Sequence, residues 1–298
     1  MNVSIIIVNY NTKELLQHAI TTIYQYTKDI TFEIIVVDNA SKDNPSILIK
    51  EKFPQVKFIR SSENIGFGRA NNLGAEIATG EVLFLLNSDT ILIENSIKKM
   101  YEYMKSHPDT ACVGGILLNS DQEEIHSYSN FPTPKMHLTL ALSRLKMHLF
   151  RVHYKIFKSK EIQQDQKPFE VPYITGADLM IRKSVWEQTG GFDPNIFMYC
   201  EESELQYRIS LLGYKRIILP DTHIIHLVGK SCTVKHRARM MHMESTLYYL
   251  KKYSVNQFSY FSFRIIFYIL CTLDFDKSYT KKERKEYLSL LNPFKNKL

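Results

Sequence analysis

The chain has 298 residues, of which 44% are hydrophobic and 23% are charged. This composition is typical of a globular protein with a sizeable core and excludes a disordered chain. The formal net charge is +7, from 38 basic and 31 acidic residues, but no recognisable nucleic-acid-binding motif accompanies it, so no nucleic-acid partner is expected. The cysteines are widely spaced, which disfavours a zinc site or disulfide framework and favours a reducing compartment; they are Cys112, Cys200, Cys232 and Cys271.

The first hundred residues alternate strand patterns with helix patterns. Apolar, β-branched runs predict buried strands at residues 4–8, 32–37, 56–60 and 81–86. Helical spacing of apolar residues over 15–23 predicts a helix between the first two strands. Uninterrupted apolar strands separated by helices predict an α/β fold, with a mostly parallel central sheet and helices on both faces.

The pattern changes after residue 110. A strand is predicted at 111–118, and Pro132-Thr133-Pro134 then breaks the chain. Strand-like alternation returns over 171–182 with an interruption at 175–178, and a last strand is predicted at 215–219. Between them, a helix that follows Tyr199-Cys200 opens with three acidic residues. Acids at a helix start suit the helix dipole, so a structural role is one alternative for all three.

The first chemical signal lies where the strand 81–86 ends. The chain turns there through Asn87-Ser88-Asp89, which leaves the Asp89 carboxylate at the carboxyl end of a strand. Ligands of open α/β sheets bind at that edge. A carboxylate suits Mg²⁺ or Mn²⁺, and such a cation suits a diphosphate. The alternative is ordinary turn chemistry, in which aspartate is common.

Nine short motifs follow one another over roughly residues 3–253. They are Val8–Asn11, Val36–Ser41, Asn64–Gly74, Leu86–Thr90, Phe131–Pro134, Thr175–Ala177, Gly190–Asp193, Tyr199–Leu205 and His226–Ser231. In this order they resemble the family 2 glycosyltransferases with the GT-A fold, particularly the bacterial rhamnosyltransferase-like branch. The resemblance implies a Rossmann-like domain over 1–253, with a nucleotide-binding half (1–100) and an acceptor-binding half (101–253). Residues 254–298 lie outside it and are expected to form a basic, apolar helical extension.

The resemblance implies a nucleotide-diphosphate sugar as donor, with Mg²⁺ or Mn²⁺ held by Asp89 and His226. The metal would neutralise the leaving diphosphate. This chain has Asn87 where many relatives have an aspartate, so the predicted metal site is short of one anionic ligand. A buried histidine bonded to the backbone is the alternative for His226.

Further donor contacts are implied along the same edge. Asp38 would bond a pyrimidine base, although a helix cap is a real competitor there. Asn9 and Asn11 would shape the first nucleotide loop, or act as simple turn formers. The glycines of the Gly66-to-Arg69 run allow close backbone approach, and its arginine adds positive charge. The complete set of expected nucleotide-sugar residues is Asn9, Asn11, Asp38, Gly66, Arg69, Asn72, Asn87, Ser88, Gly176 and Asp178.

The catalytic base is expected in the acidic helix start. The family has a Glu-Asp pair at this point whose second member takes the acceptor proton, and the matching residue here is Glu202. Glu201 would tune or position it, and is itself the second candidate for the base. Glu204 is expected to support the site without reacting. A crowded acidic cluster raises the pKa of one of its carboxyl groups, which suits a general base.

These features predict a metal-dependent, inverting glycosyltransferase of the hexosyltransferase type. It would move a sugar, with rhamnose a candidate, from a UDP- or dTDP-linked donor to a saccharide or lipid-linked acceptor in bacterial surface polysaccharide synthesis. One alternative is a sugar-nucleotide pyrophosphorylase, which would need a glycine-rich phosphate loop where this chain has Val8–Thr12. The other is a non-catalytic carbohydrate-binding relative, which the intact acidic residues disfavour.

The expected location is the cytoplasm, because the N-terminus runs directly into a strand with no leader pattern. Residues 135–160 carry seven Lys or Arg and no acid, and residues 276–298 carry seven basic and three acidic residues. Together with the apolar run 258–275, these segments predict peripheral contact with an anionic membrane. The alternative is a set of helices that pack on the body with solvated basic faces.

Overall fold

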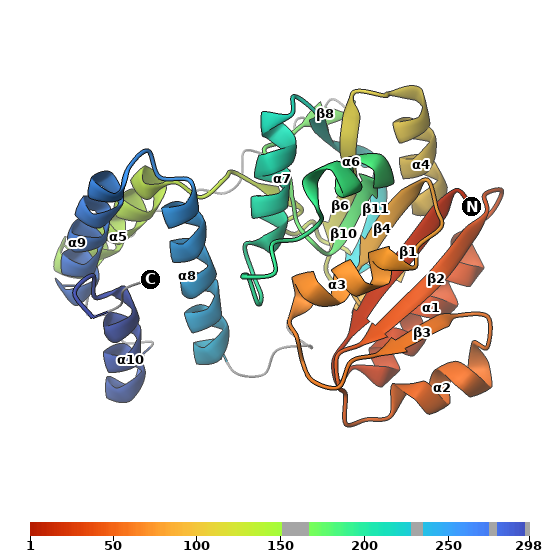
Figure 1. Ribbon diagram of the computed structural model, residues 1–298, viewed down its shortest axis with the longest axis horizontal. Coiled ribbons are helices and arrows are strands. Elements are labelled where there is room, and N and C mark those ends of the chain that lie inside the picture. The colour runs from red at the N-terminus through yellow and green to blue at the C-terminus, as the bar shows by residue number, and fades with distance from the viewer. Residues whose placement is uncertain (151–166, 228–234, 274–278, 296–298) are drawn as a thin grey trace. The chain divides into compact units, whose positions relative to one another are not determined.

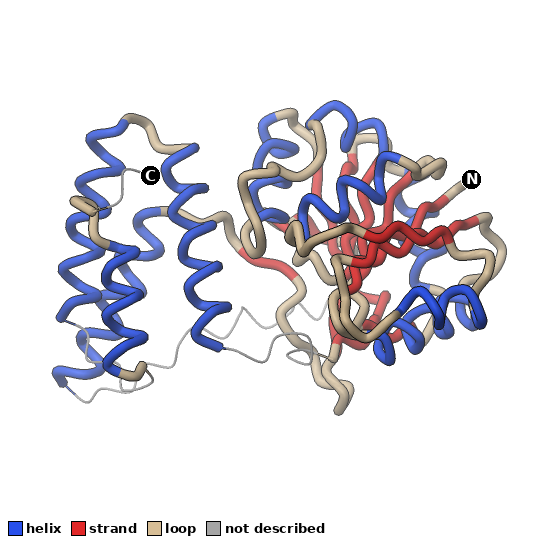
Figure 2. Tube along the Cα trace, turned by 60° about the horizontal axis from the view of Figure 1, so that its bottom comes forward, coloured by secondary structure: helices blue, strands red, loops and turns tan. Residues whose placement is uncertain are grey.

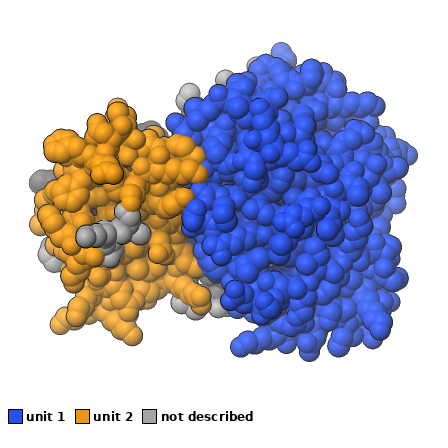
Figure 3. Space-filling view, in the orientation of Figure 1, with its two compact units in different colours: residues 1–131, 166–233 blue, residues 132–165, 234–298 orange. Residues whose placement is uncertain are grey.

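The described residues form a nine-stranded sheet in one compact unit and a group of helices in another (Figure 1). In this computed structural model, residues 1–150, 167–227, 235–273 and 279–295 are described. Residues 1–131 and 166–233 make one compact unit, and residues 132–165 and 234–298 make a second; the two are coloured separately in Figure 3. We call them the sheet unit and the helical unit.

The N-terminal half of the sheet is parallel, as predicted. Strands β1 (Val3–Asn9), β2 (Phe32–Asp38), β3 (Lys57–Arg60) and β4 (Val82–Leu86) lie in the order β3-β2-β1-β4. The intervening helices are α1 (Lys13–Tyr26), α2 (Pro45–Lys52) and α3 (Phe67–Glu76). Strands β1 and β4 are almost wholly buried because helices lie on both faces, with α3 in front of the sheet and α1 behind it in Figure 1.

The second half of the sheet is mixed. Strand β10 (Asp178–Arg182) runs antiparallel between β4 and β6 (Thr110–Leu118), and β6 pairs in parallel with β11 (Lys215–His226). Strand β11 also pairs antiparallel with β5 (Thr90–Leu92) and β8 (Phe169–Glu170). Helices α4 (Ser96–Ser106), α6 (Lys183–Thr189) and α7 (Glu201–Leu211) complete this half, and β7 (Tyr128–Ser129) pairs with β9 (Tyr173–Ile174) in a small second sheet.

One strand is longer than predicted. The sequence pattern ends a strand at Leu219, before Pro220, but β11 continues to His226. The register against β6 shifts between Ile218 and His223, so the proline lies in an irregular stretch where its missing N–H is tolerated. This continuation places His226 opposite Thr90 of β5.

The helical unit contains α5 (Pro134–Phe150), α8 (Lys235–Lys252), α9 (Gln257–Leu273) and α10 (Lys281–Leu291). Figure 2 shows them side by side, and α9 contacts the other three. The buried Arg264 of α9 donates from Nη2 to the carbonyls of Leu290 and Leu291 at 3.0 and 2.9 Å. These bonds satisfy carbonyls at the end of α10, where a cation also suits the helix dipole.

The compact units do not follow the boundary expected at residue 253, because α8 packs with α9 and α10 in the helical unit. Helix α5, which comes from the middle of the chain, belongs to the same unit. Of the basic segment 135–160, residues 151–160 lie outside the described residues. No helix in the described part of the chain has the length and apolar character that a bilayer crossing needs.

Candidate active site

Asp89 and His226 meet at one edge of the sheet. Asp89 follows β4 and is 3% exposed, and its Oδ1 lies 3.2 Å from the Nε2 of His226. The backbone fixes this approach, because the N–H of Leu227 donates to the carbonyl of Asp89 at 2.9 Å. The Nδ2 of Asn87 lies 3.4 Å from the same imidazole nitrogen. Three side chains predicted from the sequence therefore converge on one point.

These residues fit a divalent cation that is shared with a diphosphate. Asp89 offers a carboxylate oxygen and His226 an imidazole nitrogen, and both are ligands that Mn²⁺ accepts. Among the described residues, no group of three His, Cys, Asp or Glu side chains is placed to hold a metal alone. A site with two protein ligands suits Mg²⁺ or Mn²⁺ that takes its remaining oxygen ligands from phosphate and water. Of the His226 motif, residues 228–231 lie outside the described residues.

A buried network ties Asp38 to the metal edge. Parallel pairing places Asn9 beside Asp38, and Asn9 Nδ2 donates to Asp38 Oδ1 at 3.2 Å and to Ser41 Oγ at 3.0 Å. Thr12 Oγ1 donates to Asn9 Oδ1 at 2.8 Å and lies 2.9 Å from Ser88 Oγ. Because the Thr12 hydroxyl proton is used on Asn9, Ser88 is the donor in the second contact. The network runs from Asp38 to the residue before Asp89.

Asp38 itself is fully buried, and both of its carboxylate oxygens have partners. Besides Asn9, the N–H of Ser41 donates to its Oδ2 at 3.3 Å, and the Nε of Arg60 lies 3.7 Å away. Asp38 does not cap α2, whose N-cap residue is Asn44. Contact with a nucleotide base remains a prediction for Asp38. The exposed Asn11 accepts from the N–H of Lys42 at 2.7 Å and shapes the neighbouring turn, as expected for a loop former.

The glycine-rich loop is held against the segment that precedes the acidic helix. Gly66 has φ +90°, and a Cβ there would lie 2.2 Å from the carbonyl oxygen of Phe197. The N–H of Phe67 donates to that same oxygen at 3.0 Å. Asn39 bonds the loop from the other side, by accepting from Ile65 N at 2.9 Å and donating to the Gly66 carbonyl at 3.1 Å. Only glycine allows this close approach.

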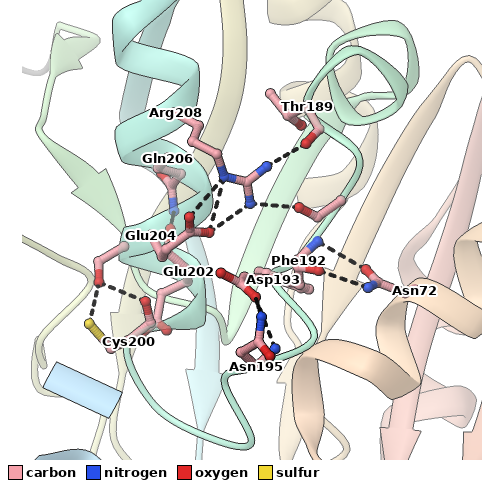
Figure 4. Close-up of polar contacts among 12 residues, drawn as sticks. Asn72, Thr189, Phe192, Asp193, Asn195, Cys200, Glu202, Glu204, Gln206 and Arg208 are labelled. Atoms are coloured by element: carbon pink, nitrogen blue, oxygen red, sulfur yellow. Dashed lines mark hydrogen bonds and ion pairs between the residues drawn. The ribbon is translucent and has the colours of Figure 1, made fainter. Parts of the chain in front are cut away.

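Arg69 and Asn72 of α3 bond to protein backbone. The exposed Arg69 donates from Nε to the carbonyl of Pro194 at 2.6 Å. Asn72 donates to the carbonyl of Phe192 and accepts from its N–H, both at 2.9 Å (Figure 4). Both residues therefore position the loop that leads to the acidic helix, and direct contact with the donor stays a prediction for them.

The turn 175–177 lies between the metal edge and the acidic helix. The carbonyl of Ala177 accepts from the N–H of Asn87 at 3.0 Å. A Cβ on Gly176 would lie 3.8 Å from the Cβ of Glu202. Gln206 of α7 clamps the start of the turn, because its side chain accepts from Ile174 N at 2.9 Å and donates to the Ile174 carbonyl at 2.7 Å. Asn87, whose side chain approaches His226, and Glu202 thus both lie against this turn.

Asp178 begins β10 inside the sheet. It is fully buried, its Oδ2 accepts from the N–H of Gly115 at 2.8 Å, and its Oδ1 has no hydrogen-bond partner among the described residues. Burial raises the pKa of this carboxyl group well above its usual range. The geometry makes Asp178 part of the sheet interior, so its predicted contact with sugar hydroxyls has no support from the burial observed.

The acidic helix α7 begins with a strained turn. Tyr199 and Cys200 have φ values of 66° and 70°, a conformation that costs non-glycine residues energy and occurs often at functional sites. Glu201 is 5% exposed, and Glu202 is partly exposed. The Oε2 atoms of both have no hydrogen-bond partner among the described residues.

The two carboxyl groups at this helix start resist ionisation to different degrees. Burial raises the pKa of Glu201 well above its usual range, and the neighbouring Glu202 charge raises it further. Burial also raises the pKa of Glu202. Burial and then the Glu202 charge raise the pKa of Tyr173, which shows that the phenol lies near this carboxylate. Because the two carboxyl groups are neighbours, the charge on one opposes ionisation of the other, and the raised pKa values belong to the pair.

Glu204, on the same helix, has a structural role. It is fully buried, and Arg208 donates to it from Nε at 2.9 Å and from Nη2 at 2.6 Å (Figure 4). The same guanidinium donates to the carbonyls of Thr189 and Gly191. Arg208 therefore fastens the Gly190-Gly191 turn to α7. Of three acids close in sequence, Glu204 is therefore ion-paired, whereas Glu201 and Glu202 each have one carboxylate oxygen with no hydrogen-bond partner among the described residues.

Sequence reasoning did not assign some residues that hold the site together. Thr12, Asn39 and Gln206 each make bonds that position predicted residues. Thr12 and Asn39 stand within or beside predicted motifs, but the pattern shows no partner for them. Gln206 lies one turn after Glu202, and that helical spacing is the only signal it offers.

Comparison with known proteins identifies the family of this chain. The family described as glycosyl transferase family 2 matches residues 4–190. The rhamnosyltransferase WbbL of Escherichia coli (strain K12) is 25% identical over 264 residues, which cover 84% of this chain and 93% of that protein. The N-acetylglucosaminyl-diphospho-decaprenol L-rhamnosyltransferase of Mycobacterium tuberculosis (strain ATCC 25618 / H37Rv) is 22% identical over 211 residues, 65% of this chain and 66% of the relative.

Solved structures share the fold. The mannosyltransferase PcManGT from Pyrobaculum calidifontis, in complex with GDP-Man and Mn²⁺, has a TM-score of 0.59 and 16% identity, covering 97% of this chain and 84% of that one. GalNAc-T7 with UDP, GalNAc and Mn²⁺ has a TM-score of 0.62 and 16% identity, covering 96% of this chain and 54% of that one. The chain therefore belongs to glycosyl transferase family 2 and has the GT-A fold.

Proposed function

We propose that this glycosyltransferase moves a sugar, with rhamnose the first candidate, from a nucleotide-diphosphate donor to an acceptor hydroxyl with inversion at the anomeric carbon. The observation that supports the proposal is the turn 175–177, which contacts Glu202 and also bonds Asn87, a neighbour of the Asp89–His226 pair. An ion site for a leaving diphosphate and an unpaired carboxylate for an incoming alcohol are the two groups that a single displacement needs.

The donor would bind along the strand ends. Asp89 and His226 would hold Mg²⁺ or Mn²⁺, and the ion would neutralise charge on the diphosphate as it leaves. The network of Asn9, Thr12 and Ser88 would fix Asp38 beside the nucleotide base. A UDP- or dTDP-linked sugar would fit, because its pyrimidine base can donate a hydrogen bond to the Asp38 carboxylate. One solved structure with the same fold contains GDP-Man, a purine nucleotide sugar. The test of donor binding must therefore include a GDP-linked sugar.

Glu202 would act as the base. The acceptor oxygen attacks the anomeric carbon, the bond from that carbon to the donor phosphate breaks, and the hydroxyl proton passes to Glu202. Glu202 is the more exposed of the two unpaired acids, so it is better placed to reach an acceptor than Glu201. A raised pKa brings its proton affinity closer to the operating pH, which makes a carboxylate a stronger general base.

The acceptor is proposed to be a saccharide or a lipid-linked saccharide in bacterial surface polysaccharide synthesis. The mycobacterial relative is named for an N-acetylglucosaminyl-diphospho-decaprenol acceptor. We therefore place the protein in the cytoplasm, in peripheral contact with the inner face of the membrane. The basic and apolar content of the helical unit supports this location.

A nucleotide-sugar panel tests the proposal. Protein stability and donor hydrolysis would be measured with UDP-, dTDP- and GDP-linked sugars, each with and without Mn²⁺. We expect one pyrimidine nucleotide to raise the melting temperature only with the metal, and Asp89→Asn to remove that shift. Glu187→Gln, an exposed change on α6, is the matched control. Equal binding without metal, or no loss in Asp89→Asn, would contradict the donor site.

A further inference from the structure

The most exposed apolar side chains lie together at one end of the helical unit. Val255, Phe258 and Phe294 are 94, 80 and 75% exposed, more than any other large apolar residue in the described part of the chain. Phe261 is 41% exposed, and its ring meets that of Phe294 edge-on with centroids 5.8 Å apart. We call these four residues the apolar tip. Large apolar side chains exposed in a group indicate an interaction surface.

The geometry of α9 makes the apolar tip a single surface. Val255 lies in the turn before α9, and Phe258 and Phe261 lie in its first two turns, three residues apart and hence on one side. The contact with Phe261 brings Phe294, from beyond α10, to the same place. Deeper in α9, Phe263 and Phe267 are buried and stack at 5.5 Å. The helix therefore anchors one aromatic face in the unit and leaves another facing solvent.

Basic side chains border the apolar tip. Lys251 and Lys252 end α8 just before the turn, and Lys295 follows Phe294; all three are exposed. The Nζ of Lys252 lies 5.5 Å from the ring centroid of Tyr253. Aromatic rings bordered by lysines suit a membrane interface, where rings enter the headgroup layer and ammonium groups contact lipid phosphates.

The charge of the two units indicates which partner binds the apolar tip. The helical unit, residues 132–165 and 234–298, contains 20 Lys or Arg and 7 Asp or Glu, a formal charge of +13. The sheet unit contains 18 and 24, a charge of −6. A second copy that docked tip to tip would bring two strongly positive units together, which Coulomb repulsion disfavours. The same positive charge attracts the helical unit to an anionic lipid surface.

We propose that the apolar tip enters an anionic lipid monolayer and that Lys251, Lys252 and Lys295 hold the phosphates around it. The inference assigns the membrane contact of the proposed function to a specific surface. It rests on that part of the proposed function and not on the reaction. It is a shallow interfacial contact, consistent with the absence of a bilayer-spanning helix among the described residues.

Co-sedimentation of the full chain with vesicles tests the inference. The vesicles would contain phosphatidylcholine alone, or phosphatidylcholine with phosphatidylglycerol, at low and high salt. We expect binding to the anionic vesicles only, weakened by salt. Phe258→Ser with Phe294→Ser should weaken partitioning by about tenfold or more. Lys251→Gln with Lys252→Gln should weaken it by a similar factor at low salt and by less at high salt.

The control is Leu211→Ser with Leu212→Ser, because these exposed residues of the sheet unit are 66 and 45% exposed and lie outside the apolar tip. This variant should bind vesicles like the unchanged protein. No binding to anionic vesicles, or equal binding by the Phe258→Ser/Phe294→Ser variant, would overturn the proposal. A concentration-dependent dimer lost in that variant, without vesicle binding, would assign the tip to a second copy. Metal-dependent nucleotide binding would be measured on the same samples. A variant that loses vesicle binding but still binds nucleotide with the metal has lost the membrane contact and not the donor site.

Discussion

Replacing Asn9 by alanine tests the network that links the nucleotide side of the site to the metal side. Asn9 is fully buried, and its amide makes three hydrogen bonds, to Asp38, Ser41 and Thr12. One of them has a charged acceptor. Buried hydrogen bonds contribute about 1 kcal/mol each and somewhat more to a charged group, so the loss should be about 3 kcal/mol of unfolding free energy.

Asn11 offers a matched comparison two residues later. It is exposed, its side chain accepts one hydrogen bond, from Lys42 N, and its φ is 56°. Asn11→Gly removes that bond and adds no strain at positive φ, so it should cost about 1 kcal/mol or less.

Urea unfolding measures both variants, and nucleotide titration with Mn²⁺ measures the site. Asn9→Ala should lower the unfolding free energy by at least about 2 kcal/mol more than Asn11→Gly. It should also weaken nucleotide binding, because Asp38 loses a partner that orients it. Equal stability of the two variants would contradict the contribution of the Asn9 hydrogen bonds. An Asn9→Ala variant that unfolds more easily but binds nucleotide as tightly as before would contradict the link between this network and the nucleotide site.

Three further predictions concern the loop, the sheet interior and the base. Gly66→Ala should lower the unfolding free energy by more than about 2 kcal/mol, measured by urea unfolding, because a Cβ would lie 2.2 Å from the Phe197 carbonyl oxygen at a φ of +90°; a change below about 1 kcal/mol would contradict the close approach. Burial raises the pKa of Asp178, so the folded protein binds more protons than the unfolded chain, and its stability falls as pH rises through that interval. Asp178→Asn should therefore gain melting temperature relative to the unchanged protein as pH rises above the ordinary aspartate pKa of about 4, and a constant difference would contradict this. Because burial raises the pKa of Glu202, kcat should fall on the acidic side with an apparent pKa above the ordinary glutamate range, and an acid limb near the usual value of about 4.3 would argue against this base.

The sequence predicted the parallel half of the sheet well, because its strands are continuous apolar runs that need burial on both faces. Strand ends of parallel neighbours meet at one edge, so Asn9, Asp38 and Asp89 were expected together there. Which atoms bond was not predictable, since the pairing of Asn9 with Asp38 depends on the exact register of β1 and β2. The role of Thr12 depends on its local bond to Asn9 and on its contact with Ser88, which follows β4.

Other features depend on contacts between distant segments. Pro220 predicted the end of a strand, but pairing with β6 and β5 carries β11 on to His226. The sequence could not show that α5 joins α8, α9 and α10 in one unit, because helical periodicity does not identify a partner. Three acids in one helix start look alike in the sequence. Only the fold shows that Arg208 pairs with Glu204, while Glu201 and Glu202 each have one oxygen with no hydrogen-bond partner in the described part of the chain.

The central claim is that one carboxylate receives the acceptor proton while a separate ion site holds the donor. The most direct measurement is the transfer rate of Glu202→Gln at saturating donor and Mn²⁺, beside Glu201→Gln. We predict that Glu202→Gln binds nucleotide with unchanged affinity and loses at least about 100-fold in kcat, while Glu201→Gln retains most of its turnover. Near-normal turnover in Glu202→Gln, or a larger loss in Glu201→Gln, would contradict the account.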